Sequence, residues 1–291
     1  MSGTINLSCY KFVRLDGLEA LRDRVKSACL AQGLKGTVLL APEGINFFLA
    51  GPRPALAAAL SVLRSVPGLE DLNPKESPSS EQPFRRMLVK IKREIIAFGV
   101  AGVDPAGSPA PRLRPSELRR WIEEGRTFTL LDTRNHYEVR MGTFKGAVAP
   151  PIWNFRDFPA ALESLPEATQ RHPVVTFCTG GIRCEKAAPL LRLRGFEEVY
   201  QLDGGILKYF EEVGGAHYEG ECFVFDARVG VGPDLRPTGS VLCHNCQMPL
   251  TAEEARLPSY VPDRSCLHCV DGKPAGRGNT ARRGSDTEGL A

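Results

Sequence analysis

The sequence has few features of a membrane or secreted protein. Its 291 residues contain no apolar run approaching the roughly 18 residues that a membrane-spanning helix needs. The first residues, M-S-G-T-I-N, lack the basic and apolar segments of a signal peptide. We therefore expect a cytoplasmic protein without a membrane partner. In that compartment, nine cysteines favour metal binding or catalysis over disulfides.

The charge balance is also too weak to identify a partner. A net charge of +3 does not by itself indicate nucleic-acid binding. Lysines and arginines are grouped between residues 85 and 93 and again between residues 112 and 120. Such groups are more often solvated surfaces, but together they permit an RNA-binding surface. The chain length predicts two or three domains.

The first 99 residues predict one α+β domain. The patterns indicate strands at 5–13, 37–41, 46–50 and 87–92, and helices at 17–32 and 54–66. We expect Asp16 to cap the first helix and Gly33 to end it. The order β-α-β-β-α-β is typical of a ferredoxin-like unit. Cys9 and Cys29 lie on the apolar sides of their elements and are expected to be inert core residues.

After a Gly/Pro-rich linker at 100–115, strands and helices alternate through residues 116–220. Helices are expected at 115–124, 185–193 and 206–213, and strands at 127–131, 174–177 and 199–202. This alternation predicts an α/β domain whose parallel sheet is covered on both faces. Ligands bind such sheets at the carboxyl ends of strands, and Cys178 directly follows one.

Cys178 begins a loop that has the residue types of a reactive-sulfur site. Thr179, Gly180, Gly181 and Ile182 would supply a cradle of backbone N–H groups, and Arg183 adds positive charge. We expect both glycines to adopt backbone angles that a Cβ would oppose. A cysteine in such surroundings has a lowered pKa and reacts as a thiolate, and the cradle could equally hold a persulfide.

Loop length separates two chemistries. Cysteine phosphatases need seven residues from cysteine to arginine to enclose a phosphate, whereas six residues run from Cys178 to Arg183. The tighter ring suits a bound sulfur better. The alternative without chemistry is a buried cysteine beside a glycine turn.

Four further residues are candidates for supporting the loop. Asp132, Arg134 and Glu138 follow the strand at 127–131, and could form a buried network whose role is structural. Cys184 could resolve a persulfide or disulfide, or could simply pack the strand against the helix.

Two C-x-x-C pairs predict a small C-terminal module at 221–270. Cys243 and Cys246 are separated by nineteen residues from Cys266 and Cys269, a spacing typical of one tetrahedral Zn²⁺ with four thiolate ligands. We expect a structural zinc that supplies the folding free energy of this short segment. A redox-active pair or a degenerate site are the alternatives. The polar tail at 271–291 is expected to be disordered.

The loop C-T-G-G-I-R-C-E-K-A resembles the active-site loop of rhodanese-like proteins. More narrowly, it resembles the bacterial family of oxygen-dependent tRNA uridine hydroxylases, and this resemblance spans roughly residues 5–270. The segment D-T-R-N-H-Y-E resembles the second rhodanese signature. G-T-V-L-L-A-P-E-G-I-N resembles the family's ferredoxin-like (acylphosphatase-like) N-terminal domain, but Phe47 and Phe48 replace the small residues expected after it.

The resemblance implies a function and its parts. The family hydroxylates the wobble uridine, position 34, of tRNA to 5-hydroxyuridine. It would make Cys178 the catalytic residue, carrying a persulfide, with molecular oxygen as co-substrate and the tRNA anticodon loop as partner. How a persulfide leads to hydroxylation does not follow from the sequence, nor do the electron source, the choice of tRNAs or the oligomeric state.

Two other functions stay open at this point. A rhodanese-type sulfurtransferase, moving sulfane sulfur from a small donor to an acceptor, needs the same loop. The flanking domains and the basic groups suit a macromolecular substrate better. A non-enzymatic RNA-binding protein is disfavoured by the intact nucleophile loop.

Overall fold

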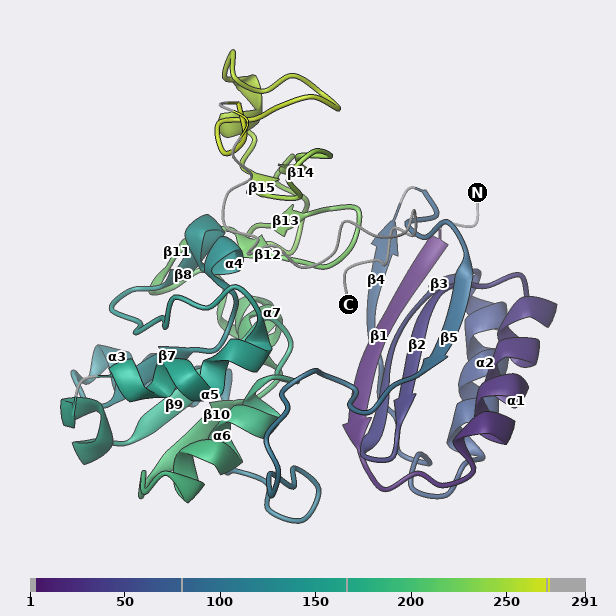
Figure 1. Cartoon of the computed structure of the whole chain (residues 1–291), viewed down its shortest axis with the longest axis horizontal. Coiled ribbons are helices and arrows are strands. Elements are labelled where there is room, and N and C mark those ends of the chain that lie inside the picture. The colour runs from purple at the N-terminus through teal and green to yellow at the C-terminus, as the bar shows by residue number, and fades with distance from the viewer. Residues whose placement is uncertain (1–3, 80, 166, 271, 273–291) are drawn as a thin grey trace. The chain divides into compact units, whose positions relative to one another are not determined.

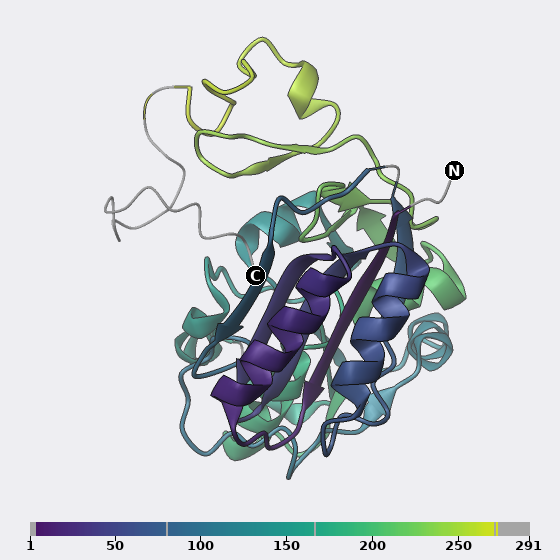
Figure 2. The ribbon, with the colours of Figure 1, turned by 90° about the vertical axis from the view of Figure 1, so that its right-hand side faces the viewer.

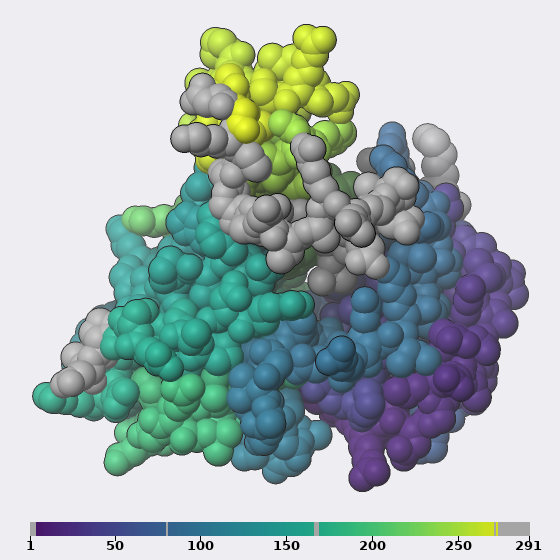
Figure 3. Space-filling model, in the orientation of Figure 1, coloured from purple at the N-terminus to yellow at the C-terminus, as the bar shows by residue number. Residues whose placement is uncertain are grey.

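The computed structural model describes residues 4–79, 81–165, 167–270 and 272, and the chain divides into two compact units. Unit 1 contains the residues up to Gly99 together with Asp104–Ser108, and unit 2 contains Val100–Val103 and the chain from Pro109 onward. Figures 1 and 3 show unit 1 in purple to blue and most of unit 2 in teal, green and yellow. Apart from Gly272, the tail predicted to be disordered lies outside the described residues.

Unit 1 is a five-stranded sheet with two helices on one face (Figure 2). The sheet order is β4-β1-β3-β2-β5, and buried side chains of both helices share one core with the strands. Its elements are β1 (Thr4–Phe12), α1 (Leu18–Ala31), β2 (Lys35–Ala41), β3 (Gly44–Gly51), α2 (Arg53–Arg64), β4 (Lys75–Ser79) and β5 (Met87–Ile91).

The ferredoxin-like order is present, and the strand predicted at 87–92 is confirmed as β5, but it is not the fourth strand of that unit. Lys75–Ser79 completes the unit by pairing antiparallel with β1, whereas Met87–Ile91 pairs parallel with β2 at the opposite edge. The sequence of β4, K-E-S-P-S, is polar and contains a proline, which suits an edge strand. It has no run of apolar or β-branched residues, so the sequence did not predict a strand here.

The ends of α1 are formed by glycines. The N-cap is Gly17, in the left-handed region with φ 60°, so the predicted cap by Asp16 was wrong. At the other end Gly33, with φ 63°, donates to the Leu30 carbonyl, and Leu34 donates to the Cys29 carbonyl, each at 3.0 Å. This Schellman motif confirms Gly33 as the stop.

Unit 2 is built on a parallel sheet of order β6-β10-β9-β7. Its strands are β6 (Arg112–Leu113), β7 (Thr129–Asp132), β9 (Val174–Phe177) and β10 (Val199–Leu202). Its helices are α3 (Pro115–Glu123), α4 (His136–Met141), α5 (Phe158–Ala161), α6 (Cys184–Leu193) and α7 (Gly205–Val213), with 3₁₀ turns at Phe155–Asp157, Leu162–Ser164, Glu167–Arg171 and Glu254–Arg256. Short antiparallel pairs are β8 (Gly142–Phe144) with β11 (Tyr218–Gly220), β12 (Cys222–Phe223) with β13 (Gly230–Val231), and β14 (Val241–Leu242) with β15 (Pro249–Leu250).

Helices cover both faces of the parallel sheet. On one face, Leu202 and Phe177 share a core with α3 and α7. Gln201, which alternates with Leu202 along β10, points the other way and donates to Glu185 of α6 at 3.1 Å. All four residues of β9 are buried, as expected of a central strand.

The structure modifies two segments of the predicted layout. Part of the predicted linker, Arg112–Leu113, forms the edge strand β6. Cys222, Val224 and Val231, which we had assigned to the C-terminal module, pack in the core of the parallel-sheet domain. Among the described residues, no helix is both long and apolar enough to cross a membrane.

Candidate active site

The Cys178 loop joins the carboxyl end of β9 to the start of α6, as the sequence predicted. The Cys178 side chain is 0% exposed. Its sulfur accepts a hydrogen bond from the Gly181 N–H at 3.0 Å. The loop therefore holds a sulfur inside a ring of its own backbone, and Gly180 and Ile182 are its half-buried members.

The surroundings of Cys178 favour its thiolate. Burial raises the pKa of the thiol, but hydrogen bonds from Cys184 and from loop N–H groups, together with the charge of Arg183, lower the pKa to about 6. Burial and the neighbouring thiolate raise the pKa of Cys184 well above its ordinary value. Cys184 therefore stays protonated and can donate to Cys178, and its sulfur also lies 3.9 Å from the Thr133 hydroxyl.

Only one of the two loop glycines has the conformation we predicted. Gly181 lies in the left-handed region with φ 103°. Gly180 does not, and a Cβ built on it would meet nothing within 4 Å. The backbone requirement for glycine therefore applies to Gly181, and the prediction for Gly180 was wrong.

Arg183 is held by a buried carboxylate. Its two terminal nitrogens donate to the two oxygens of Glu138 at 2.6 and 2.7 Å, and both side chains are at most 5% exposed. Glu138 also accepts from the Asn135 N–H at 3.1 Å, which ties the pair to the start of α4. Arg183 thus acts on Cys178 through its charge, while its planar fork points at Glu138.

Asp132 and Arg134 form a second, separate buried ion pair. The Arg134 Nη2 atom lies 2.6 Å from Asp132 Oδ2 and 2.6 Å from the Gly142 carbonyl, and both side chains are 0% exposed. The Arg134 guanidinium lies 5.9 Å from the ring centre of Phe177, the residue before Cys178. Of Asp132, Arg134 and Glu138, three of the four predicted supporting residues, Glu138 therefore contacts the loop arginine, and the other two lie beside the strand that carries Cys178.

The structure adds one contributor that our sequence analysis missed, Gly205. Its φ is +65°, and a Cβ there would lie 2.4 Å from the Cys178 carbonyl. Ile206 and Leu207 then donate to the carbonyls of Cys178 and Thr179 at 3.0 and 3.1 Å. The sequence D-G-G-I after a strand was the available signal, but only the tertiary fold shows which loop it approaches.

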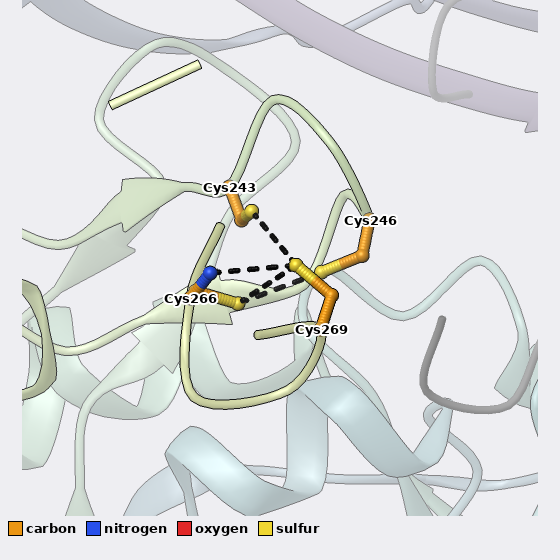
Figure 4. A group of neighbouring side chains, drawn as sticks. All are labelled: Cys243, Cys246, Cys266 and Cys269. Atoms are coloured by element: carbon orange, nitrogen blue, oxygen red, sulfur yellow. Dashed lines mark hydrogen bonds between the residues drawn. The ribbon is translucent and has the colours of Figure 1, made fainter. Parts of the chain in front are cut away.

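The four C-terminal cysteines come together (Figure 4). Their sulfurs all lie within 4.8 Å of one another, and three pairs are 3.6–3.8 Å apart. A zinc tetrahedron with Zn–S bonds of about 2.3 Å requires about 3.8 Å between ligands. Backbone N–H groups of Cys266 and His268 point at two of the sulfurs. The donor set and its spacing fit a tetrahedral metal.

The structure describes the two basic groups of the sequence in turn. Three arginines of the second group, at 112–120, lie beside carboxylates. Arg112 pairs with Glu185, Arg119 with Glu123, and Arg120 lies beside Glu117. In unit 1, Arg85, Arg86, Lys92 and Arg93 are exposed around β5.

A parallel sheet that carries a buried, ionised cysteine in a six-residue loop is the architecture of a rhodanese-like domain. Residues 114–212 match the family model of the rhodanese-like domain, and residues 4–95 match that of the UPF0176 acylphosphatase-like domain. A solved rhodanese-like domain from Anabaena sp. is 30% identical over 38% of this chain and 79% of that chain, with a TM-score of 0.32.

Relatives match almost the whole chain. The tRNA uridine(34) hydroxylases of Cupriavidus taiwanensis and Cupriavidus necator are both 50% identical over 274 residues, 92% of this chain and 97% of theirs. That of Burkholderia mallei is 47% identical over 292 residues, 97% of this chain and 98% of its own. The chain therefore belongs to the tRNA uridine(34) hydroxylase family.

Proposed function

We propose that this protein hydroxylates uridine 34 of tRNA at C5, giving 5-hydroxyuridine, with molecular oxygen as co-substrate. Near-full-length similarity to the tRNA uridine(34) hydroxylases supports this over a sulfurtransferase. The observation that carries the assignment of Cys178 as catalytic residue is its sulfur, buried at the end of β9 with a pKa of about 6.

Several residues in and around the loop favour the ionised sulfur or hold the loop in place. At pH 7, a pKa of about 6 leaves about 90% of Cys178 as thiolate. Gly181 donates to that sulfur, Arg183 supplies charge, and Glu138 fixes the orientation of Arg183. Thr179 anchors the loop by donating its hydroxyl hydrogen to the Phe223 carbonyl at 3.3 Å.

Burial of the sulfur supports a persulfide as its working form. Cys178 Sγ is enclosed, so a base of RNA cannot touch it directly. A persulfide adds an outer sulfur about 2 Å from Sγ, the length of an S–S bond. Within the loop, Gly180 and Ile182 are the residues partly open to solvent, so a substrate would reach an outer sulfur from their side.

The anticodon loop is the part of tRNA that must reach Cys178, since it contains position 34. The exposed cations around β5 of unit 1 support a contact with the tRNA backbone, which is negatively charged throughout. Such a substrate supports a cytoplasmic location for the enzyme.

Cys243, Cys246, Cys266 and Cys269 would hold one Zn²⁺. The metal would act as a structural ion that folds the module, without a step in the reaction. Arg140 of α4 ties this module to the parallel-sheet domain, because it pairs with Glu254 at 2.5 Å and donates to the Pro249 carbonyl.

The test is genetic and chemical. The gene is deleted in the source organism, and 5-hydroxyuridine and its derivatives are measured in bulk tRNA by mass spectrometry. Wild type and Cys29→Ala, a core cysteine of unit 1, should restore the modification, and Cys178→Ala should not. Unchanged modification in the deletion strain would reject the function. Restoration by Cys178→Ala would reject the assigned cysteine.

A further inference from the structure

Three aromatic rings border the Cys178 loop. Tyr137 of α4, Phe223 of β12 and Phe225 pack edge to face in a row, with ring centroids 5.5 Å apart for the first pair and 5.0 Å for the second. We call these three residues the aromatic wall. Phe223 is 1% exposed, whereas Tyr137 and Phe225 are half-buried and present part of their surface to solvent.

The aromatic wall is attached to the loop at two points. The Phe223 carbonyl accepts the hydroxyl hydrogen of Thr179 at 3.3 Å, so the strand of the wall touches the residue after Cys178. The Arg183 guanidinium lies 5.7 Å from the ring centre of Phe225. The same guanidinium stabilises the Cys178 thiolate, so Phe225 and the reactive sulfur are neighbours of one charged group.

The aromatic wall also packs against a buried apolar cluster. Phe223 shares a buried cluster with Met141 and Val229, and Tyr137, Phe225 and Leu242 pack against that cluster. The Tyr137 hydroxyl accepts a hydrogen bond from Asn135 at 3.0 Å. Phe225 is held by this packing yet partly open to solvent, and an aromatic ring placed in this way suits a planar ligand.

A uridine substrate supplies such a ligand. Enzymes that modify a base remove it from its stack, and proteins that read single-stranded RNA hold the displaced base against aromatic rings. We propose that the ring of Phe225, supported by Phe223, is the surface on which the uracil base of the target nucleotide stacks beside the sulfur. This deepens the proposed function and rests on it.

The proposal is tested by RNA binding, which does not require turnover. Anticodon stem-loop RNAs carry uridine, an abasic site or dihydrouridine at position 34; dihydrouridine keeps the polar edge of the base but is not flat. Wild type should bind the uridine RNA about 5- to 150-fold more tightly than either of the others, the range expected for one stacked base.

Variants assign this difference to Phe225. Phe225→Leu stays apolar but cannot stack, so it should bind the uridine RNA no more tightly than the abasic and dihydrouridine RNAs. Phe225→Tyr should keep the wild-type preference for uridine. The matched control is Leu242→Ala, because Leu242 packs on the same cluster. This variant should also keep the preference.

Two results would overturn the proposal. Equal binding of uridine and dihydrouridine RNA by wild type would do so without any variant. A Phe225→Leu protein that still prefers the uridine RNA over the other two would do so as well, even if its affinity for all three RNAs has fallen. Hydroxylation by wild type is assayed in parallel. Activity without the stacking preference contradicts only this inference, whereas a lack of activity contradicts the proposed function.

Discussion

Replacing Cys184 by alanine tests the electrostatics of the loop, because it removes the thiol that donates to the Cys178 sulfur. A hydrogen bond to a charged group contributes about 1.5–3 kcal/mol, and about 1.4 kcal/mol corresponds to one pKa unit. The pKa of Cys178 should therefore rise from about 6 to about 7–8. At pH 7 the thiolate fraction then falls from about 90% to about 10–50%.

The assay is a pH titration of thiolate ultraviolet absorbance, with the curve of Cys178→Ser subtracted. Cys222→Ala is the matched control, because Cys222 is equally buried and burial raises the pKa of its own thiol to about 12. The control should leave the Cys178 titration unchanged. A wild-type pKa close to that of an ordinary thiol would refute the reasoning, and so would an unchanged pKa in Cys184→Ala.

The same ionisation should appear in stability. An unfolded thiol has a pKa near 8.5, and folding lowers the pKa of Cys178 to about 6. The resulting stabilisation is fully present above about pH 8.5 and is lost as the pH falls through about 6. The free energy of unfolding of wild type relative to Cys178→Ser should therefore shrink by up to about 3 kcal/mol between pH 9 and pH 5. A difference independent of pH would contradict the lowered pKa.

Three further changes probe the supports of the loop and the metal site. Gly181→Ala should lower stability by about 1–3 kcal/mol and abolish hydroxylation, because the φ of Gly181 is 103°. Gly180→Ala should do neither. Equal effects of the two substitutions on thermal unfolding would contradict this. Glu138→Gln should cost about 3–5 kcal/mol in denaturant unfolding, since it leaves the Arg183 charge buried without its carboxylate, and a loss below about 1 kcal/mol would show that the pair is not buried in solution. Cys266→Ser should remove one equivalent of zinc and make the C-terminal module sensitive to protease, while the Cys178 titration persists. Metal analysis that finds no zinc in wild type would reject the site.

The reactive loop could be predicted from sequence because its signals are local. A short apolar strand, a cysteine, two glycines, an arginine and a helix follow one another within twenty residues of chain. The four-cysteine site could be predicted equally well, because the spacing of the two C-x-x-C pairs is typical of a zinc site. In both cases the chemistry depends on residues whose order in the chain already fixes their proximity.

What the sequence could not supply depends on contacts between distant segments. Glu138 meets Arg183 across 45 residues, and no local pattern distinguishes it from Asp132 as the partner. A side chain at Gly205 would clash with the Cys178 carbonyl, a contact between segments that no local pattern reveals. The strand β4 exists because β1 offers it an edge, since its own polar residues carry no strand pattern.

The pairing of Arg183 with Glu138 also bears on which substrate the loop can accept. If Arg183 were unpaired, its charge would attract a small anionic sulfur donor to Cys178. Instead the buried carboxylate already balances that charge, so the thiolate gives the three groups a net negative charge. An anion entering this enclosed site would be repelled at low dielectric, whereas a neutral uracil ring would not. The electrostatics therefore impose no charge penalty on a neutral uracil beside the sulfur, which agrees with the family to which the chain belongs.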